Sequence, residues 1–286
     1  MVSTQLQTQT YEQEIAAWHQ SMEDKLRAET GWLTLTGLYW LHEGENTLGS
    51  DPASDVILPG NTPEHLGSIE FHDGTATLHI TADVEVRVDG VVIAKTNRLR
   101  PDTDVQGASL VEIGAVNFFL IKRSDEYAIR MRDRNNPARQ NFTGRVWFPV
   151  NPAYRVTAEF KPYSALKTLE IINVLGMMEP TLSPGVVDFV LDGHDIRLEA
   201  FDASSDQIWF VFRDASPQTY PAARFLYATV NSDNTVVLDF NKAYNPPCAF
   251  TDFATCPLPP KQNILTFPIE AGEKITHETA RASASE

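Results

Sequence analysis

Hydrophobic positions near the start of the chain recur with the period of an α-helix. The apolar residues lie three or four positions apart: Tyr11, Ile15, Trp18, Met22 and Leu26. This spacing places them on one face and predicts an amphipathic helix from Tyr11 to Glu29. Gly31 is suited to end the helix, because glycine readily adopts the left-handed conformation of helix carboxy termini. We expect the apolar stripe to pack on a sheet as a brace rather than to bind a partner.

From Trp32 onward the pattern changes to short apolar or alternating runs separated by Gly, Pro, Asn and Asp, which is typical of strands and turns. The expected strands are 68–71, 76–80, 84–88, 116–122, 127–132, 155–160, 168–174, 186–191, 195–201, 207–213, 224–230, 235–241 and 264–269. Asp73-Gly74, Asp89-Gly90 and Asp192-Gly193 predict tight hairpin turns. Many short strands without intervening helices indicate an all-β fold, with two β-sandwich or barrel-like modules and an N-terminal amphipathic helix.

The expected organisation follows from these elements. The helix occupies 1–30, a first β module 31–134, and a second β module 135–275 with a proline-rich loop at 241–263. Residues 276–286 form a polar tail that we expect to be flexible.

Composition narrows the function classes. The chain has 286 residues, of which 42% are hydrophobic and 21% charged, so it has the composition of a globular protein. Its 23 Lys and Arg face 38 Asp and Glu, a net charge of −15 that disfavours nucleic acid and anionic membranes. Neither a signal peptide pattern nor a long apolar run is present. We therefore expect a soluble, cytoplasmic protein with neither partner, in which Cys248 and Cys256 are usually reduced.

Two strand patterns near the carboxy terminus predict a hairpin. Residues 224–230 and 235–241 flank a polar four-residue link, 231–234. If Val230 faces Thr235, Arg224 lies opposite Asn241 and diagonal to Asp239, and these three polar side chains share one face.

The segment that follows is too rich in proline for a helix or a central strand, yet it carries several aromatic residues and little charge. These features favour a long ordered loop, and such loops are disproportionately functional. We expect residues 239–256, lying over the polar hairpin face, to form a pocket for a small anionic or polar molecule. The candidate ligand-binding residues are Arg224, Asp239, Asn241, Tyr244, Asn245, Cys248 and Thr251. The alternative is that ion pairs and turn caps among these residues only lock the loop in place.

The segment from Gly49 to Pro59, followed by Glu64-His65-Leu66-Gly67 and later by Val88-Asp89-Gly90, resembles the pattern of the forkhead-associated domain. That resemblance covers about a third of the chain and implies a β-sandwich whose loops read phosphothreonine. However, Ser50, Asp51, Pro63 and Glu64 stand where that family presents Arg and a Ser-Arg pair. Acidic side chains repel a phosphate, so we expect the fold without phosphothreonine binding.

The carboxy-terminal segment resembles the uncharacterised prokaryotic family named domain of unknown function 1684. The residues that carry the resemblance are Asp239 to Thr251, Ala254 to Pro260, Asn263 and Glu270 to Lys274, with further fixed points at Gly31-Trp32-Leu33, Gly37-Leu38, Trp40-Leu41, Arg132-Asp133, Phe142 to Gly144 and Arg224-Phe225-Leu226. The resemblance extends over nearly the whole chain and implies no particular activity.

The sequence identifies no reaction. Cys248 could act as a nucleophile, but no His lies within its segment, so a structural thiol or a disulfide with Cys256 is favoured. Two Cys at this spacing do not form a zinc set, and we predict no metal site. Acidic and amide oxygens of the segment could instead bind a hard cation, with the structural interpretation favoured. No motif indicates a cofactor or a familiar catalytic class.

The leading hypothesis is a small-molecule binding protein or an unassigned enzyme; the alternative is a structural or protein-interaction module.

Overall fold

The computed structural model describes residues 10–202 and 207–276. The fold is all-β, as the sequence predicts, with 45% of residues in strands and 14% in helices. The chain divides into two compact units. One unit is the continuous stretch Arg27–Phe142, and the other combines the segments before and after that stretch.

The unit Arg27–Phe142 contains two sheets around one core. One sheet has the order β1 (Leu35–Trp40), β11 (Glu126–Asp133), β10 (Val116–Arg123), β9 (Val111–Ile113), β6 (Arg87–Val88) and β7 (Val91–Val92). The other has the order β3 (Val56–Ile57), β2 (Gly44–Gly49), β4 (Gly67–His72), β5 (Thr75–Ile80) and β8 (Thr96–Leu99). Buried residues of both sheets, among them Leu48, Leu78 and Phe118, belong to a single hydrophobic cluster. Two sheets that share a core form a β-sandwich. The short helix α2 (Pro137–Asn141) follows β11.

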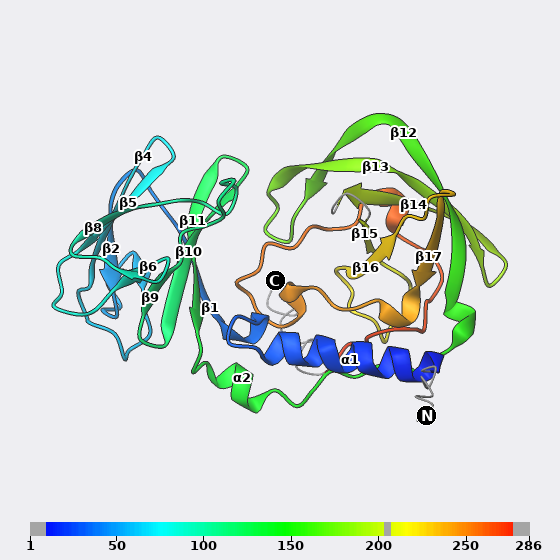
Figure 1. Ribbon diagram of the computed structural model, residues 1–286, viewed down its shortest axis with the longest axis horizontal. Helices are drawn as coiled ribbons and strands as arrows, with labels where there is room; N and C mark the ends of the chain where they lie inside the picture. The colour runs from blue at the N-terminus through cyan, green and yellow to red at the C-terminus, as the bar shows by residue number, and fades with distance from the viewer. Residues whose placement is uncertain (1–9, 203–206, 277–286) are drawn as a thin grey trace, which may run out of the picture. The chain divides into compact units, whose positions relative to one another are not determined.

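The second unit is a nearly closed barrel (Figure 1). Its sheet has the order β16 (Arg224–Thr229), β15 (Gln207–Phe212), β14 (His194–Asp202), β13 (Met178–Leu191), β12 (Arg155–Ile172) and β17 (Thr235–Asp239). A single bridge between Val230 and Val236 joins the two end strands, β16 and β17. Beyond that bridge the two strands are not paired, so the barrel has an open seam between them.

Alternation along the strands explains the barrel core. In β17, Val236 and Leu238 are buried, whereas Val237 is partly exposed. In β16, Leu226 is buried beside them and Tyr227 is exposed. Because successive side chains point to opposite faces of a strand, the buried set fills the interior and the other set faces outward.

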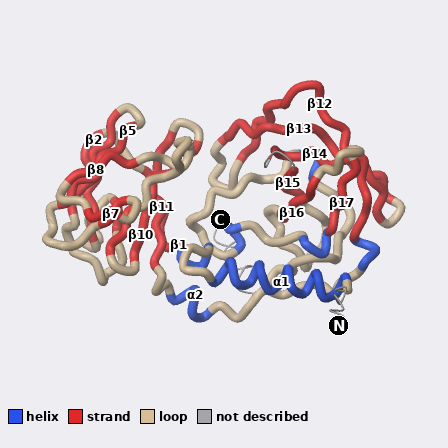
Figure 2. Tube along the Cα trace, in the orientation of Figure 1, coloured by secondary structure: helices blue, strands red, loops and turns tan. Residues whose placement is uncertain are grey.

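Helix α1 (Tyr11–Arg27) matches the predicted amphipathic helix (Figure 2). Its buried residues, Ile15, Met22 and Leu26, belong to the predicted apolar stripe. The expected glycine cap is wrong: Gly31 has an ordinary extended φ of −70° and precedes the 3-10 helix Trp32–Thr34. In the described part of the chain, no helix is both long and apolar enough to cross a membrane.

The three Asp-Gly turns are confirmed, since each joins two adjacent antiparallel strands and both residues have positive φ, as in Asp192 (50°) and Gly193 (78°). Two strand predictions are corrected. Residues 264–269 are a loop with one bridge from Ile264 to Arg213 rather than a strand. The strands expected at 155–160 and 168–174 are one strand, β12, which continues through an irregularity between Pro162 and Lys167.

The predicted hairpin register is wrong by one residue. Val230 pairs with Val236 rather than with Thr235, and Asn231 N donates to Thr235 O at 2.9 Å. The loop is therefore three residues, 232–234, and it ends on Asn234 with a positive φ of 60°. A three-residue loop that ends in the left-handed conformation is a common hairpin type, and Asn tolerates that conformation better than most residues.

Candidate functional site

A cavity of about 260 Å³ lies at the open seam of the barrel. We call it the seam pocket. Its lining residues come from four strands and the two turns beside them: Arg155, Gln207, Tyr227, Ala228, Thr229, Asn231, Val237, Asp239 and Lys242. Most of the lining residues occupy the outward-facing positions of their strands, so the pocket opens on the outer face of the barrel rather than into its core.

Two cationic side chains line the seam pocket and differ in their pairing. Lys242 forms an ion pair with Glu14 of α1 at 2.6 Å. Arg155 is exposed, and its guanidinium lies 5.3 Å from the centre of the Tyr11 ring. Within residues 10–202 and 207–276, the Arg155 side chain makes neither a hydrogen bond nor an ion pair, whereas its backbone N–H donates to Pro152 O. Its five N–H donors therefore stay free for a ligand.

Asp239 contributes a carboxylate with two contrasting oxygens. The residue is only 6% exposed. Oδ1 accepts hydrogen bonds from the Tyr11 hydroxyl at 2.9 Å, from Asn241 N at 3.2 Å and from Asn241 Nδ2 at 3.1 Å. Oδ2 is buried and has no hydrogen-bond partner among the described residues. Buried carboxylate oxygens usually accept hydrogen bonds, so Oδ2 is an exception that calls for an explanation.

The side-chain amide of Asn241 connects the neighbourhood of Asp239 to other parts of the unit. Its Oδ1 accepts from Asn151 N at 2.9 Å, and its Nδ2 donates to Asn151 O at 3.0 Å and to the Tyr11 hydroxyl at 2.9 Å. His19 Nε2 lies 3.2 Å from Asn241 O. Burial lowers the pKa of His19, and burial together with Asp239 raises the pKa of Tyr11. Helix α1 thus fixes Asp239 and Asn241 through neutral donors.

Arg224 does not belong to this pocket. Because the register differs by one residue, Arg224 points into the barrel while Asp239 points outward, and the predicted shared polar face does not exist. Arg224 is 0% exposed and pairs with Asp214 at 2.9 Å. It also donates to Ile269 O at 3.1 Å and to Ala271 O. These contacts hold the segment 269–271 against the barrel.

The remaining four candidates lie along the proline-rich loop, outside the lining of the seam pocket. Tyr244 forms a backbone bridge with Phe225. Asn245 N donates to Glu273 Oε2 at 2.8 Å, and its side chain donates to Lys274 O at 3.0 Å. The Thr251 hydroxyl accepts from the backbone of the same loop. The loop is thus ordered largely by its own backbone and by the segment 273–274.

Cys248 and Cys256 are both buried, and no disulfide joins them. Cys248 N donates to Cys256 Sγ at 3.3 Å, and Cys248 O accepts from the Tyr220 hydroxyl at 3.0 Å. Their surroundings are those of small buried side chains that pack in a loop.

A second buried ion pair lies beneath the loop. Arg145 and Glu273 are each 1% exposed, and Arg145 Nη1 donates to Glu273 Oε2 at 2.5 Å. The Arg145 guanidinium also lies over the Phe250 ring at 4.8 Å. Burial raises the pKa of Glu273 to about 7, although Arg145 opposes this shift. Sequence reasoning missed this pair, because the two residues are 128 positions apart.

Of the residues that line the seam pocket, only Asp239 was among the candidates predicted from the sequence. Asp239 was predicted from the hairpin pattern. Arg155 and Tyr227 were not, because the seam depends on which strands pair across the sheet. Lys242 lies within Asp239 to Thr251, the segment that resembles the family, and could have been found there. Tyr11 was recognised only as part of the apolar stripe of the helix.

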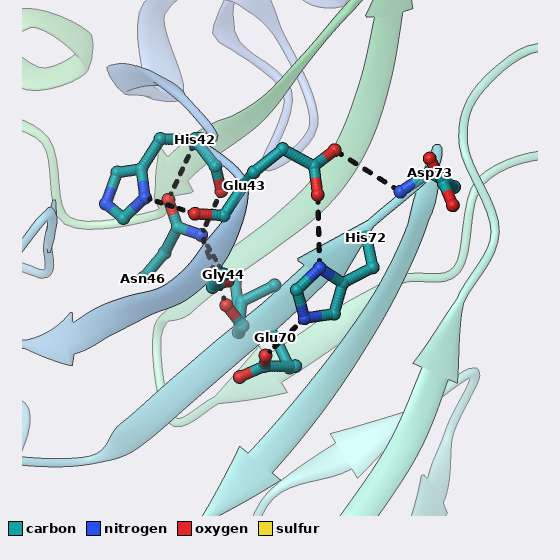
Figure 3. Close-up of polar contacts among 8 residues, drawn as sticks. His42, Glu43, Gly44, Asn46, Glu70, His72 and Asp73 are labelled. Atoms are coloured by element: carbon teal, nitrogen blue, oxygen red, sulfur yellow. Dashed lines mark hydrogen bonds and ion pairs between the residues drawn. The ribbon is translucent and has the colours of Figure 1, made fainter.

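The exposed side chains of Glu43, Glu70 and His72 form a surface network on the unit Arg27–Phe142 (Figure 3). His72 Nδ1 lies 3.1 Å from Glu43 Oε2, and its Nε2 lies 2.7 Å from Glu70 Oε1. These two carboxylates raise the pKa of His72, which is exposed. Asn46 donates to His42 O at 2.8 Å. In the described part of the chain, no group of three or more His, Cys, Asp or Glu could hold a metal ion.

Comparison with known proteins agrees with the resemblance of the carboxy-terminal part. Residues 140–274 match the family model described as "Protein of unknown function (DUF1684)", and this part of the chain belongs to that family. The match includes every residue named above in the proline-rich loop and both buried ion pairs. The fixed points expected between Gly31 and Asp133 lie outside it.

One similar solved structure is the solution NMR structure of an uncharacterized protein of Haloarcula marismortui. It is 31% identical, covers 48% of this chain and 78% of its own, and has a TM-score of 0.40. No curated protein matches the chain.

Proposed function

We propose that this protein binds a small polar molecule and that the seam pocket is its binding site. The observation that supports the proposal is the buried Asp239 Oδ2, which lacks a partner among the described residues beside the unpaired Arg155. A buried acceptor without a partner costs about 1–3 kcal/mol. A ligand that donates to Oδ2 would remove this cost, which is a physical reason for the site to be filled.

The dimensions of the seam pocket restrict the ligand. Pockets for drug-sized ligands are roughly 300–1,000 Å³. The seam pocket, at about 260 Å³, is slightly smaller than that range. Most of its lining residues are polar, and Val237, Ala228 and the Tyr227 ring supply the apolar surfaces. A small metabolite with several polar groups therefore fits better than a peptide or a lipid chain.

A thermal-shift screen of small polar and anionic compounds tests this proposal with three proteins: wild type, Arg155→Met and Lys261→Met. Lys261 is an exposed cation of the same unit outside the pocket, so its variant matches the loss of charge. We expect some compounds to raise the melting temperature of wild type and of Lys261→Met but not of Arg155→Met. The proposal fails if no compound shows this dependence on Arg155.

The alternative function, a structural or interaction module, is supported by the two ion pairs Arg224–Asp214 and Arg145–Glu273, whose side chains are at most 1% exposed.

For the unit Arg27–Phe142 we propose a degenerate forkhead-associated sandwich without phosphothreonine binding. Asp51 Oδ1 caps its own turn by accepting from Ala53 N at 2.9 Å, and its charge disfavours a phosphate there. Titration with phosphothreonine peptides should show no binding, and micromolar binding would contradict this view.

A further inference from the structure

We propose that the ligand of the seam pocket is a small polyhydroxylated anion, such as a sugar acid or a sugar phosphate. This inference rests on the proposed function and adds the chemical class of the ligand. It is derived from three features of the pocket that demand different groups on one molecule: an unpaired cation, a buried unpaired acceptor and a polar rim beside an aromatic ring.

The cation demands an anionic group. Arg155 is exposed at the pocket, and its guanidinium has neither a hydrogen bond nor an ion pair within residues 10–202 and 207–276. A guanidinium presents a planar fork of donors that matches a carboxylate or a phosphate. Lys242 adds a second positive charge to the lining, although Glu14 offsets it at 2.6 Å. The ligand therefore carries its negative charge at the Arg155 side of the pocket.

The buried acceptor, Asp239 Oδ2, demands a hydrogen-bond donor on the same ligand that carries the anionic group. An ionised carboxylate can only accept hydrogen bonds. Oδ1 of Asp239 already accepts from Tyr11 and Asn241, which leaves Oδ2 for the ligand. Asp239 and Arg155 are directly opposite each other on β17 and β12. The donor must therefore lie close to the anionic group, as a hydroxyl does in a hydroxylated acid.

The rim favours several hydroxyls rather than one. Gln207, Thr229 and Asn231 line the pocket with side chains that both donate and accept. Tyr227 is 45% exposed, and its ring stacks on Trp209 with a centroid distance of 5.9 Å and an interplanar angle of 11°. A rigid aromatic face beside hydrogen-bonding side chains suits a ligand whose carbon skeleton has C–H groups on one side and hydroxyls on the other.

The volume is consistent with this class. The seam pocket, at about 260 Å³, is just below the roughly 300–1,000 Å³ of pockets for drug-sized ligands. A six-carbon sugar acid or sugar phosphate is smaller than a drug-sized ligand and suits a pocket of this volume. An aliphatic acid would leave Asp239 Oδ2 without a donor, and a neutral polyol would leave Arg155 without an anion.

Isothermal titration with four probes tests the class: gluconate, glucose 6-phosphate, hexanoate and sorbitol. Hexanoate has the carboxylate without hydroxyls, and sorbitol has the hydroxyls without the charge. We expect gluconate or glucose 6-phosphate to bind at least tenfold more tightly than hexanoate and sorbitol. The comparison between these two anions distinguishes a carboxylate ligand from a phosphate ligand.

Asp239→Asn separates the role of Oδ2 from that of the fold. The variant keeps an oxygen in the place of Oδ1 for Tyr11 and Asn241 and puts an NH₂ donor in the place of Oδ2. We expect its melting temperature to stay near that of wild type and its affinity for the favoured polyhydroxylated anion to fall at least tenfold. Its weak affinity for hexanoate should not change, and Lys261→Met should behave as wild type with all probes.

The outcomes distinguish the two proposals. If hexanoate or sorbitol binds as tightly as the polyhydroxylated anions, or if neither of those anions binds, the ligand class proposed here is wrong. The seam pocket would still be a binding site if the compound screen yields ligands that depend on Arg155. If the screen yields none, both proposals fail.

Discussion

Arg224 and Asp214 are each 0% exposed, and each makes several hydrogen bonds. Asp214 accepts from Arg224 through Oδ2 and from Ser216 N, the Thr219 hydroxyl and Ile269 N through Oδ1. Removing one partner of such a pair leaves a buried charge unpaired, whereas an exposed pair contributes little. These residues therefore act in the scaffold, and the seam pocket depends on them only through the fold.

The variant Arg224→Met keeps the aliphatic stem and removes the charge. We expect the free energy of unfolding in urea to fall by about 3–5 kcal/mol, because Asp214 is left unpaired in the interior. Adding Asp214→Asn should restore part of the loss and keep the test interpretable even if the single variant folds poorly. Arg197→Met, which removes an exposed partner of Asp188, serves as the control. An Arg224→Met protein as stable as that control would contradict the scaffold role.

Glu273 predicts a pH dependence of stability with a definite sign. Burial raises its folded pKa from 4.5 to about 7, so between these values the folded state binds more protons than the unfolded state. Stability contributed by the protonated carboxyl is therefore full below about pH 4.5 and is lost as the pH rises through 7. The loss is on the order of 3 kcal/mol.

Urea unfolding of wild type and Glu273→Gln at pH 5 and pH 8 measures this contribution, because Gln cannot titrate. The stability of wild type relative to the variant should fall between pH 5 and pH 8. A relative stability that rises instead would mean that Arg145 holds Glu273 ionised in the folded protein.

At the scale of elements, the segment 269–274 closes the barrel unit against the proline-rich loop. Phe148 N donates to Gly272 O, and Glu273 N donates to Ala243 O, both at 2.8 Å. Gly272 has a φ of +77°, and a Cβ there would lie 2.3 Å from Ala243 O and 2.7 Å from Phe240 O. Glycine is therefore required both by the backbone conformation and by the close approach of the loop.

The variants Gly272→Ala and Gly193→Ala separate these two requirements. Gly193 has nearly the same φ, +78°, but open space where its Cβ would be. We expect Gly193→Ala to cost about 1–2 kcal/mol from backbone strain alone. Gly272→Ala should cost clearly more in the same thermal unfolding assay, because the loop backbone must also move. Equal losses of stability would show that the loop backbone can move away from the added Cβ without destabilising the protein.

At the scale of the whole molecule, the two units differ in how the chain builds them. The unit Arg27–Phe142 is one continuous stretch, and its hydrophobic cluster is contributed entirely by that stretch. The barrel unit is discontinuous, because α1 precedes the inserted stretch and provides Tyr11 to Asp239 and Asn241.

Expression of two fragments tests this organisation. Residues 27–142 should fold alone, with a β-type circular dichroism spectrum and one cooperative thermal transition, because the fragment keeps its complete core. Residues 143–286 lack α1, whose Trp18 ring contacts Trp147 and Tyr244 and whose Ile15, Met22 and Leu26 are buried, so this fragment should be unstable or insoluble. A stable 143–286 fragment would show that α1 is dispensable for the barrel.

Local patterns in the sequence determined the all-β class, helix α1 and the Asp-Gly hairpins, because each depends on residues close together in the chain. The period of apolar positions places Ile15, Met22 and Leu26 on one helix face, whatever surrounds them. An Asp-Gly pair such as Asp192-Gly193 accepts positive φ at both positions and thereby specifies a tight turn. The ordered proline-rich loop was predicted on the same local grounds.

Only the tertiary structure decided the site. The choice between a four-residue and a three-residue loop depends on Asn234, whose positive φ shifts the register by one position and turns Asp239 away from Arg224. The side chains that gather around Asp239 come from residues as distant as Tyr11, 228 positions away. Which strand pairs with which, and where the barrel stays open, depends on long-range contacts that no local pattern encodes. For this reason Asp239 could be named from the sequence, whereas Arg155 beside it could not.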